Sequence, residues 1–365
     1  LKVTALTDKV TVTITENIGS EKYDGKEKTV SGYTVSIDNE LYKESYFTFS
    51  GDATVKGTDA GSYDMKLKPE DFKNTSENFT NVEFVIVDGT LEISKRSVTL
   101  TSATDDKVYD GEALTNNEVT VGGDGFAEGE GATYAVTGTI TEVGETANTF
   151  SYTLNEGTKA ANYDITTTAG TLTVTELTDK VTVTITENSG SETYDGAEKT
   201  VTGYTVSIDN KLYTDADFTF SGKATVTGTD AGTYNMELTA EDFTNNSNNF
   251  TNVEFVIVDG TLEIRKRTVT LTSADDEKVY DGTALTNDKV TVSGDGFADG
   301  EGATYDVTGT ITEVGETANA FTYTLNEGTK AANYEISQVE GTLEVTALTD
   351  KVTVTITENS GSETY

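Results

Sequence analysis

The sequence predicts an all-β protein built as a tandem array, and three observations support this. Long stretches such as Val10–Thr15, VTVTIT, alternate apolar and polar residues, which is the period of a strand with one buried face. The residues that alternate are largely β-branched, and such residues suit a pleated, half-buried surface. The same segments then return along the chain at a fixed period, which is typical of repeat architectures.

The repeat is measured from one segment. DKVTVTITEN begins at Asp8, Asp179 and Asp350, so successive copies start 171 residues apart. The tripeptide Tyr-Asp-Gly recurs twice within each period, starting at Tyr23, Tyr109, Tyr194 and Tyr280. Each period therefore holds two related modules, A and B, of about 85 residues, which is enough for one modest core. The predicted modules are A1 (5–94), B1 (95–175), A2 (176–264) and B2 (265–346), followed by the opening of a further type A module (347–365).

The elements of a type A module follow from the alternation and the turn residues. Strands are predicted at 10–15, 82–87 and 90–93, with Asp88-Gly89 as the turn between the last two. Residues 61–68, GSYDMKLK, recur as GTYNMELT at 232–239, with every second residue retained. This pattern predicts a strand with Tyr63, Met65 and Leu67 buried. Pro69–Phe72 predicts a single helical turn.

The type B modules show the same pattern of retention. Phe150-Ser-Tyr152 becomes Phe321-Thr-Tyr323, and Tyr134-Ala-Val136 becomes Tyr305-Asp-Val307, so the retained aromatic residues are predicted to be buried. We therefore expect each module to be a small β-sandwich-like unit, either Ig-like or β-grasp-like.

The joins between modules predict the path of the chain. Neither glycine nor proline lies between the strands at 90–93 and 98–101, whereas a flexible linker would need a longer Gly/Ser-rich stretch. The last strand of each module is therefore predicted to continue almost directly into the next module. The first and last strands of a module would be parallel if they are neighbours. Four modules in line would form an elongated rod of very roughly 120–160 Å, at ~3.3 Å per strand residue.

Composition excludes several function classes. The chain has 25 Lys plus Arg against 63 Asp plus Glu, a formal net charge of −38, which repels nucleic acid and anionic lipid. No apolar stretch approaches the ~18 residues of a membrane span, so neither nucleic acid nor membrane insertion is expected. Cysteine and histidine are both absent, which removes disulfides, thiolate ligands and the usual neutral-pH acid/base. With no unique cluster of polar residues, we expect no enzyme, no catalytic residue and no cofactor-binding residue.

A family resemblance rests on several quoted segments. KVYDGTALTN, GDGFADGEGATYDVTGTITEVGETAN, YTLNEGTKAANY and the closing GTLEVT resemble the MBG/YDG-type repeat modules of large, Gram-positive-like bacterial surface adhesins. The resemblance covers essentially the whole chain, with the type A modules as a longer variety. It implies a secreted parent protein at the cell surface or in the cell wall, with the modules in tandem in an adhesin-like stalk. It assigns no catalytic or ligand residue.

The Tyr-Asp-Gly tripeptide predicts a tight turn. In that interpretation the aspartate (Asp24, Asp110, Asp195, Asp281) bonds back to the chain, glycine takes a positive φ, and tyrosine packs inward. The alternative is a functional carboxylate beside an aromatic platform, but a site repeated four times in adjacent modules would be unusual.

An acidic loop in each type B module is the candidate metal site. It carries three carboxylates spaced by glycines, which could bind a hard cation such as calcium: Asp124, Glu128 and Glu130 in B1, and Asp295, Asp299 and Glu301 in B2. The spacing matches no established calcium loop, so a solvated acidic turn is the alternative, and no cofactor other than calcium is expected. An isopeptide crosslink would need a lysine at a fixed place. Lys107 and Lys278 precede their turns, but Lys22 becomes Thr193 in the other type A module.

Two function classes remain. The favoured one is a structural stalk that projects a distal binding domain, with adjacent repeat modules of the same chain as the partners of each module. The alternative is a set of repeated ligand-binding adhesin modules that contact host or neighbouring-cell molecules, with avidity through repetition. An outward-facing cluster retained in both copies would favour the alternative, whereas drift of the outward residues favours the stalk.

Overall fold

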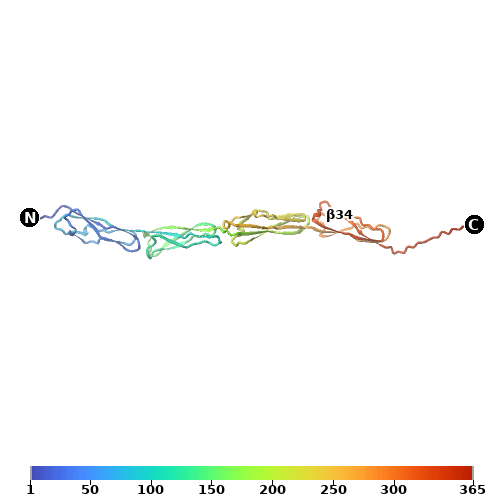
Figure 1. Cartoon of the computed structure of the whole chain (residues 1–365), viewed down its shortest axis with the longest axis horizontal. Helices are drawn as coiled ribbons and strands as arrows, with labels where there is room; N and C mark the ends of the chain where they lie inside the picture. Colours follow the sequence, from blue (N-terminus) through green and yellow to red (C-terminus); the bar gives the residue numbers. More distant parts are fainter. Residues whose placement is uncertain (1, 364–365) are drawn as a thin grey trace. The chain divides into compact units, whose positions relative to one another are not determined.

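The computed structural model describes residues 2–363 and consists almost entirely of strands and short connections (Figure 1). This confirms the predicted all-β class. The chain divides into two compact units, Leu1–Thr178 and Asp179–Tyr365, and each contains one type A and one type B module. The helical segments of the described residues are single 3-10 turns, and none of them has the length and apolar character needed to cross a membrane.

The two type A modules have the same ten strands. In A1 these are β1 (Val10–Glu16), β2 (Gly19–Lys22), β3 (Lys28–Ser31), β4 (Tyr33–Ile37), β5 (Phe47–Phe49), β6 (Thr54–Gly57), β7 (Gly61–Asp64), β8 (Phe72–Asn74), β9 (Val82–Val87) and β10 (Thr90–Ser94). In A2 they are β19 (Val181–Glu187), β20 (Gly190–Thr193), β21 (Lys199–Thr202), β22 (Tyr204–Ile208), β23 (Phe218–Phe220), β24 (Thr225–Gly228), β25 (Gly232–Asn235), β26 (Phe243–Asn245), β27 (Val253–Val258) and β28 (Thr261–Arg265). The predicted helical turn is confirmed as η2 (Pro69–Asp71), repeated as η5 (Ala240–Asp242); η1 (Glu44–Tyr46) and η4 (Asp215–Asp217) precede β5 and β23.

The two type B modules have eight strands each. In B1 these are β11 (Arg96–Ser102), β12 (Asp105–Val108), β13 (Val119–Gly123), β14 (Ala132–Val136), β15 (Gly144–Asn148), β16 (Phe150–Leu154), β17 (Tyr163–Thr168) and β18 (Gly170–Thr175), with η3 (Ala160–Asn162) before β17. In B2 they are β29 (Arg267–Ser273), β30 (Asp276–Val279), β31 (Val290–Gly294), β32 (Ala303–Val307), β33 (Gly315–Asn319), β34 (Phe321–Leu325), β35 (Tyr334–Val339) and β36 (Gly341–Thr346), with η6 (Ala331–Asn333) before β35.

Types A and B share the arrangement of their two three-stranded sheets. In A1, β1 lies between antiparallel β4 and parallel β9, and β10 lies between parallel β2 and antiparallel β7. In B1, β11 lies between antiparallel β13 and parallel β17, and β18 lies between parallel β12 and antiparallel β15. A2 and B2 repeat this order. The first and last strand segments of each module therefore point the same way, as predicted.

The joins within each unit are as short as predicted. Lys95 alone separates β10 from β11, and Lys266 alone separates β28 from β29. Residues 176–180 lie between β18 and β19.

Residues 347–363, the opening of the predicted further type A module, form no strand. Their Val352, Val354 and Ile356 are exposed, unlike the equivalent Val10, Val12 and Ile14, which are fully buried in A1.

The predicted alternation around Leu67 is right for the burial of Met65 and Leu67, and wrong for the full burial of Tyr63 and for the backbone. Met65 and Leu67 are buried, Tyr63 is half-buried, and the residues between them are exposed. However, the regular strand β7 ends at Asp64, because Lys66 takes a left-handed conformation with φ of +65°. In the B modules Tyr152 is 37% exposed, which contradicts its predicted burial, although its counterpart Tyr323 is half-buried.

A buried carboxylate replaces strand pairing at this point. Glu16 is 2% exposed, and its two oxygens accept the N–H groups of Leu67 at 2.6 Å and Gly89 at 2.7 Å. A side chain at position 89 would collide with the backbone of Asn17, so only glycine fits at this position. Two charge-assisted hydrogen bonds compensate the carboxylate for its loss of water. The break between β9 and β10 is thereby fixed in place.

Candidate functional site

The Tyr-Asp-Gly turns have the predicted geometry in all four modules. The first aspartate oxygen accepts the N–H group two residues later, at 2.9 Å in each turn, and the glycines have φ between +78° and +83°. In the A modules a lysine four residues on pairs with the aspartate, as Lys28 does with Asp24 at 2.7 Å. In the B modules the lysine lies three residues before it, as in Lys107–Asp110. Lys107 and Lys278 therefore belong to the Tyr-Asp-Gly turns, whereas Lys22 pairs with Asp124 of the acidic loop.

In the type A modules the tyrosine of this turn forms a hydrogen bond with the following type B module. Tyr23 is 4% exposed, and its O–H group donates to one oxygen of Glu130 in B1. The other oxygen of Glu130 accepts the O–H group of Tyr163 at 2.8 Å, and the two tyrosine rings meet edge to face with centroids 5.6 Å apart. Tyr163 O in turn accepts the N–H group of Ala127 at 2.9 Å. Burial, followed by the bond to Glu130, raises the pKa of Tyr23 to about 12.

An arginine at the join fastens the acidic loop to the turn. Arg96 is the first residue of β11, and its guanidinium donates to the carbonyl oxygens of Tyr23 at 3.3 Å, Gly125 at 2.9 Å and Asp124. One planar cation therefore holds the Tyr-Asp-Gly turn of A1 and the acidic loop of B1 together. A lysine could not present donors in this fork geometry.

Asp124 closes the base of the loop. One of its oxygens accepts from the N–H and O–H groups of Ser97, both at 3.0 Å, and the other pairs with Lys22 of A1 at 2.7 Å. The Lys22 ammonium, together with the Ser97 bonds, holds the pKa of Asp124 well below its usual range.

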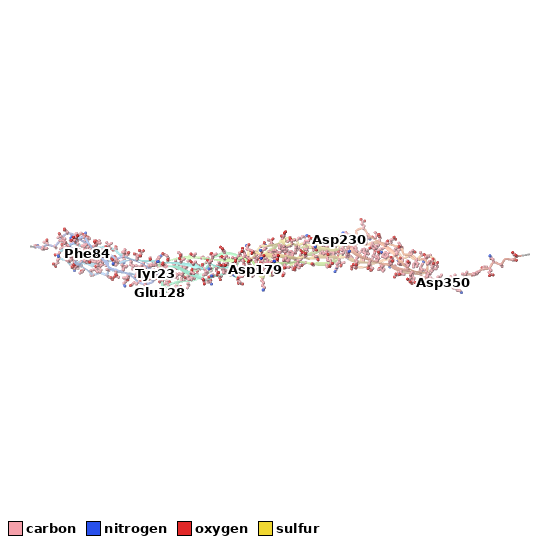
Figure 2. The ribbon with its side chains drawn as sticks, viewed as in Figure 1. Tyr23, Phe84, Glu128, Asp179, Asp230 and Asp350 are labelled. Atoms are coloured by element: carbon pink, nitrogen blue, oxygen red, sulfur yellow. The ribbon has the colours of Figure 1, made fainter. Side chains whose placement is uncertain are left out.

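A second set of contacts lies on the β6–β7 loop of A1. Asn162 is fully buried; its amide oxygen accepts the N–H group of Ala60 at 2.8 Å, and its amide nitrogen donates to Asp59 at 3.0 Å. Lys159 pairs with the other oxygen of Asp59 at 2.7 Å. The type A module is therefore held at both its Tyr-Asp-Gly turn and its β6–β7 loop. We call the two sets of contacts together the A–B junction; Figure 2 labels Tyr23 of A1 and Glu128 of the B1 loop in this region.

The second unit repeats the junction with one loss. Glu301 accepts from Tyr194 at 2.5 Å and from Tyr334 at 2.6 Å, and Arg267 donates to Tyr194, Gly296 and Asp295. Asn333 and Lys330 bind Asp230 as in the first unit. Asp295 keeps its bonds to Thr268, but Thr193 stands where A1 has Lys22, so the ion pair to the loop is specific to the first unit.

The structure places the predicted calcium ligands at different points of the junction. Asp124 faces Ser97 and Lys22, Glu130 faces the two tyrosines, and Glu128 is exposed. In B2, Asp295 and Glu301 are likewise separated, and Asp299 is exposed. Among residues 2–363, no three metal-binding side chains gather at one point. Calcium at these loops stays a prediction.

Sequence reasoning missed most of the junction. Arg96, Asn162, Asp59 and Tyr163 were not singled out, although all four are retained in the second unit as Arg267, Asn333, Asp230 and Tyr334. A buried asparagine or an arginine at a strand start carries no signal of its own. Retention of polar residues at a module boundary was the signal that could have found them.

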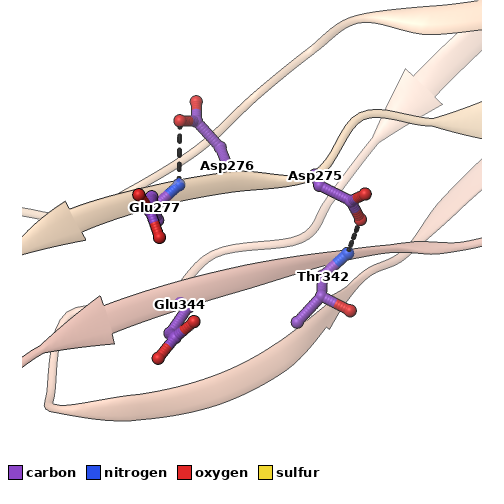
Figure 3. Close-up of a pocket in the computed structure, with 5 residues that line it drawn as sticks. All are labelled: Asp275, Asp276, Glu277, Thr342 and Glu344. Carbon is purple, nitrogen blue, oxygen red and sulfur yellow. Dashed lines mark hydrogen bonds between the residues drawn. The ribbon is translucent and has the colours of Figure 1, made fainter.

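An acidic hollow on B2 is a separate feature (Figure 3). It is lined by Asp275, Asp276, Glu277, Thr342 and Glu344. Asp275 accepts the N–H group of Thr342 at 2.7 Å, and Glu277 lies in register with Glu344 on the parallel strands β30 and β36. In B1 the equivalents of Asp275 and Glu344 are Thr104 and Thr173. The hollow is therefore not a repeated site.

Comparison with known proteins agrees with the repeat organisation. The MBG domain model matches residues 10–95 and 181–266, which are the strands of A1 and A2. No curated protein sequence matches the chain. Among solved structures, the I9–I11 tandem from titin is similar at 11% identity and a TM-score of 0.19, covering 68% of this chain and 99% of that one. The N-terminal eight Ig domains of Down Syndrome Cell Adhesion Molecule are similar at 11% identity and a TM-score of 0.18, covering 93% and 57%. Such scores carry no argument about this chain.

The family match has a coarse functional meaning. MBG domains in tandem fit a repeat region of an extracellular surface or adhesion protein. The match extends over all ten strands of each type A module, from β1 to β10 and from β19 to β28. Over these residues the two type A modules match the MBG domain family.

Proposed function

We propose that the chain is a structural stalk region of a bacterial surface protein, anchored at the cell surface or wall, which projects a distal binding domain. The observation that carries the proposal is the A–B junction. It fixes two successive modules to each other through buried groups, and both units retain it. A spacer needs such fixed joins, because a flexible join would let adjacent modules fold back on each other.

The strand order supports a load-bearing role. A force on the two ends of a module enters at β1 and leaves at β10. β1 pairs with β9, and β2 pairs with β10, both in parallel. Such a force acts along these ladders, so several hydrogen bonds must break together instead of one after another. Forced unfolding is governed by the unfolding rate, which this arrangement lowers.

The proposal assigns the chain no catalytic role and no cofactor. The polar groups buried at the junction are used in contacts between modules: Tyr23 and Tyr163 share Glu130, and Asn162 holds Asp59 and Ala60. These groups make the contacts that hold the two modules together.

Single-molecule pulling of the full chain tests the proposal. We expect high unfolding forces, with the release of a module's full length in each event. The predicted rod is tested separately by small-angle scattering, where a maximum dimension near ~70 Å, that of a compact globule, would contradict it. Modules that open at low force, strand by strand, would refute the load-bearing role.

The alternative is a repeated ligand-binding region. One observation favours it: the outward residues of β1, β4 and β9 are identical to those of β19, β22 and β27 in the other type A module.

A further inference from the structure

The apolar core of A1 continues into B1. Buried side chains of A1 and those in the adjoining part of B1 form one contiguous hydrophobic cluster. The buried residues that B1 contributes to it are Val98, Leu100, Ala127 and Tyr163. The ring of Tyr163 meets that of Tyr23 across the boundary, and Phe126 contacts it within B1 with ring centroids 5.1 Å apart. The part of B1 next to A1, which we call its proximal half, therefore packs on the core of A1.

The strands β12, β15 and β18 form the other half of B1, which we call its distal half, and it has a separate core. The buried apolar residues of this core are Leu114, Leu172 and Val174. In B2 the distal half is formed by β30, β33 and β36, and its separate core consists of Leu285, Leu343 and Val345. A core of this size buries little apolar surface, so it contributes little to the stability of the module.

Buried polar groups lie between the two halves of B1, where β11 ends and β18 begins. Ser102 is 2% exposed and Asn148 is fully buried. The hydroxyl group of Ser102 donates to the carbonyl oxygen of Asn148 at 2.6 Å and accepts the N–H group of Gly170 at 2.9 Å. This polar layer interrupts the apolar core, so the distal half gains no packing from the cluster that A1 and the proximal half share.

The type A module has no such division of its core. Glu16 ends β1 as Ser102 ends β11, yet the buried residues on both sides of Glu16 belong to one cluster. Those near the end of the module include Met65, Leu67, Leu91 and Ile93. An aromatic group adds to this core, since the ring of Phe72 contacts four others with centroids 4.9 to 6.0 Å apart: Tyr33, Phe47, Phe49 and Phe84. The core of A1 is therefore complete within its own module.

We propose that each type B module is conditionally folded, which means that it stays folded only while it is docked on the type A module before it. The junction stabilises both modules by the same free energy, because coupling is reciprocal. Only the type B module has too small a core of its own to stay folded when that free energy is lost. The A–B junction is then a switch, and breaking it opens B1 while A1 remains folded.

The switch would change the length of the chain at a defined point. An opened type B module is a segment of about 80 residues, which at ~3.3 Å per residue can extend to roughly 260 Å. The inference does not rest on the stalk role, since it concerns the stability of the modules in solution without force.

Two equivalent core substitutions in the full chain test this dependence. Leu91 in β10 and Leu172 in β18 occupy the same position of their modules, and both are fully buried. Hydrogen exchange measured by mass spectrometry reports on all four modules, with the second unit as an internal reference. We expect Leu91→Ala to speed exchange at least tenfold in both A1 and B1. Leu172→Ala should speed exchange in B1 alone.

The two substitutions also give the results that would overturn the proposal. If B1 keeps its protection in Leu91→Ala while A1 loses it, the two modules fold independently. If A1 loses its protection in Leu172→Ala, the dependence runs both ways and the type B module is not the conditional partner. Neither result bears on the unfolding forces that test the stalk role.

A junction variant tests the switch without altering either core. In Asp59→Ala, Asn162 and Lys159 lose their acceptor on the β6–β7 loop. We expect exchange in B1 to become several-fold faster than in B2, with A1 unchanged. The matched control Asp64→Ala removes an exposed carboxylate at the end of β7 and should leave B1 as protected as in the parent chain. Equal exchange in the two variants would show that the junction does not control the folding of B1.

Discussion

Tyr23 of the first module donates its phenolic O–H group to Glu130, 107 residues later in the second module. Tyr163 donates to the same carboxylate from the other side. One acidic side chain therefore joins two modules that each have their own sheets. The acidic loop that carries it is a structural part of the join between modules.

Replacing Glu130 should weaken this join. Glu130→Ala leaves the phenols of Tyr23 and Tyr163 without their acceptor, and a buried unsatisfied polar group costs about 1–3 kcal/mol. We expect urea unfolding of the full chain to show a loss of that order in the first unit. Glu128→Ala is the matched control, since it removes an exposed carboxylate two residues away and should change little. Equal effects of the two substitutions would show that Glu130 does not couple the modules.

Alkaline pH should destabilise the first unit through Tyr23. Its pKa is raised from 10.0 to about 12 in the folded chain, so the folded state holds the phenolic proton more tightly than the unfolded state. The stabilisation is fully present below pH 10 and is lost as pH rises through 12. Denaturant unfolding at a series of pH values measures it. Tyr23→Phe should flatten the fall in stability over this range, and an unchanged slope would contradict the assignment.

Lys66→Gly should stabilise the type A module. Lys66 has φ of +65°, a conformation that costs a side-chain-bearing residue about 1 kcal/mol and glycine almost nothing. Because Lys66 is exposed, little packing is lost with its side chain, although the added freedom of glycine in the unfolded chain offsets part of the gain. We expect a small rise in melting temperature, and Glu237→Gly should give the same in A2. Lys68→Gly, in extended backbone, is the control and should destabilise.

Calcium provides the test of the predicted metal loops. A loop that binds calcium would raise the melting temperature when millimolar calcium is added, and EDTA would reverse the rise. Asp124 already binds Ser97 and Lys22, and Glu130 already accepts hydrogen bonds from two tyrosines. We therefore expect no shift in melting temperature. A reversible rise that disappears in Asp124→Asn would show that the loop rearranges to hold the ion.

The sequence predicted the features that depend on local pattern. The strands around Val12 and Leu91, the Asp-Gly turns and the short join at Lys95 all follow from alternation and turn chemistry. It failed at Lys66, where the bond from Leu67 N–H to the distant Glu16 overrides the local strand preference. It also failed to find the A–B junction, because Arg96 and Asn162 gain their roles only from residues far along the chain.

The parallel arrangement of first and last strands has a consequence for how such proteins change over generations. The chain enters and leaves every module travelling in the same direction, and each type A module meets its type B module through the same set of residues apart from Lys22, which is Thr193 in A2. A recombination event that duplicates or deletes one 171-residue period therefore creates no new kind of join. The number of periods in the array can then change without compensating substitutions in the core of any module.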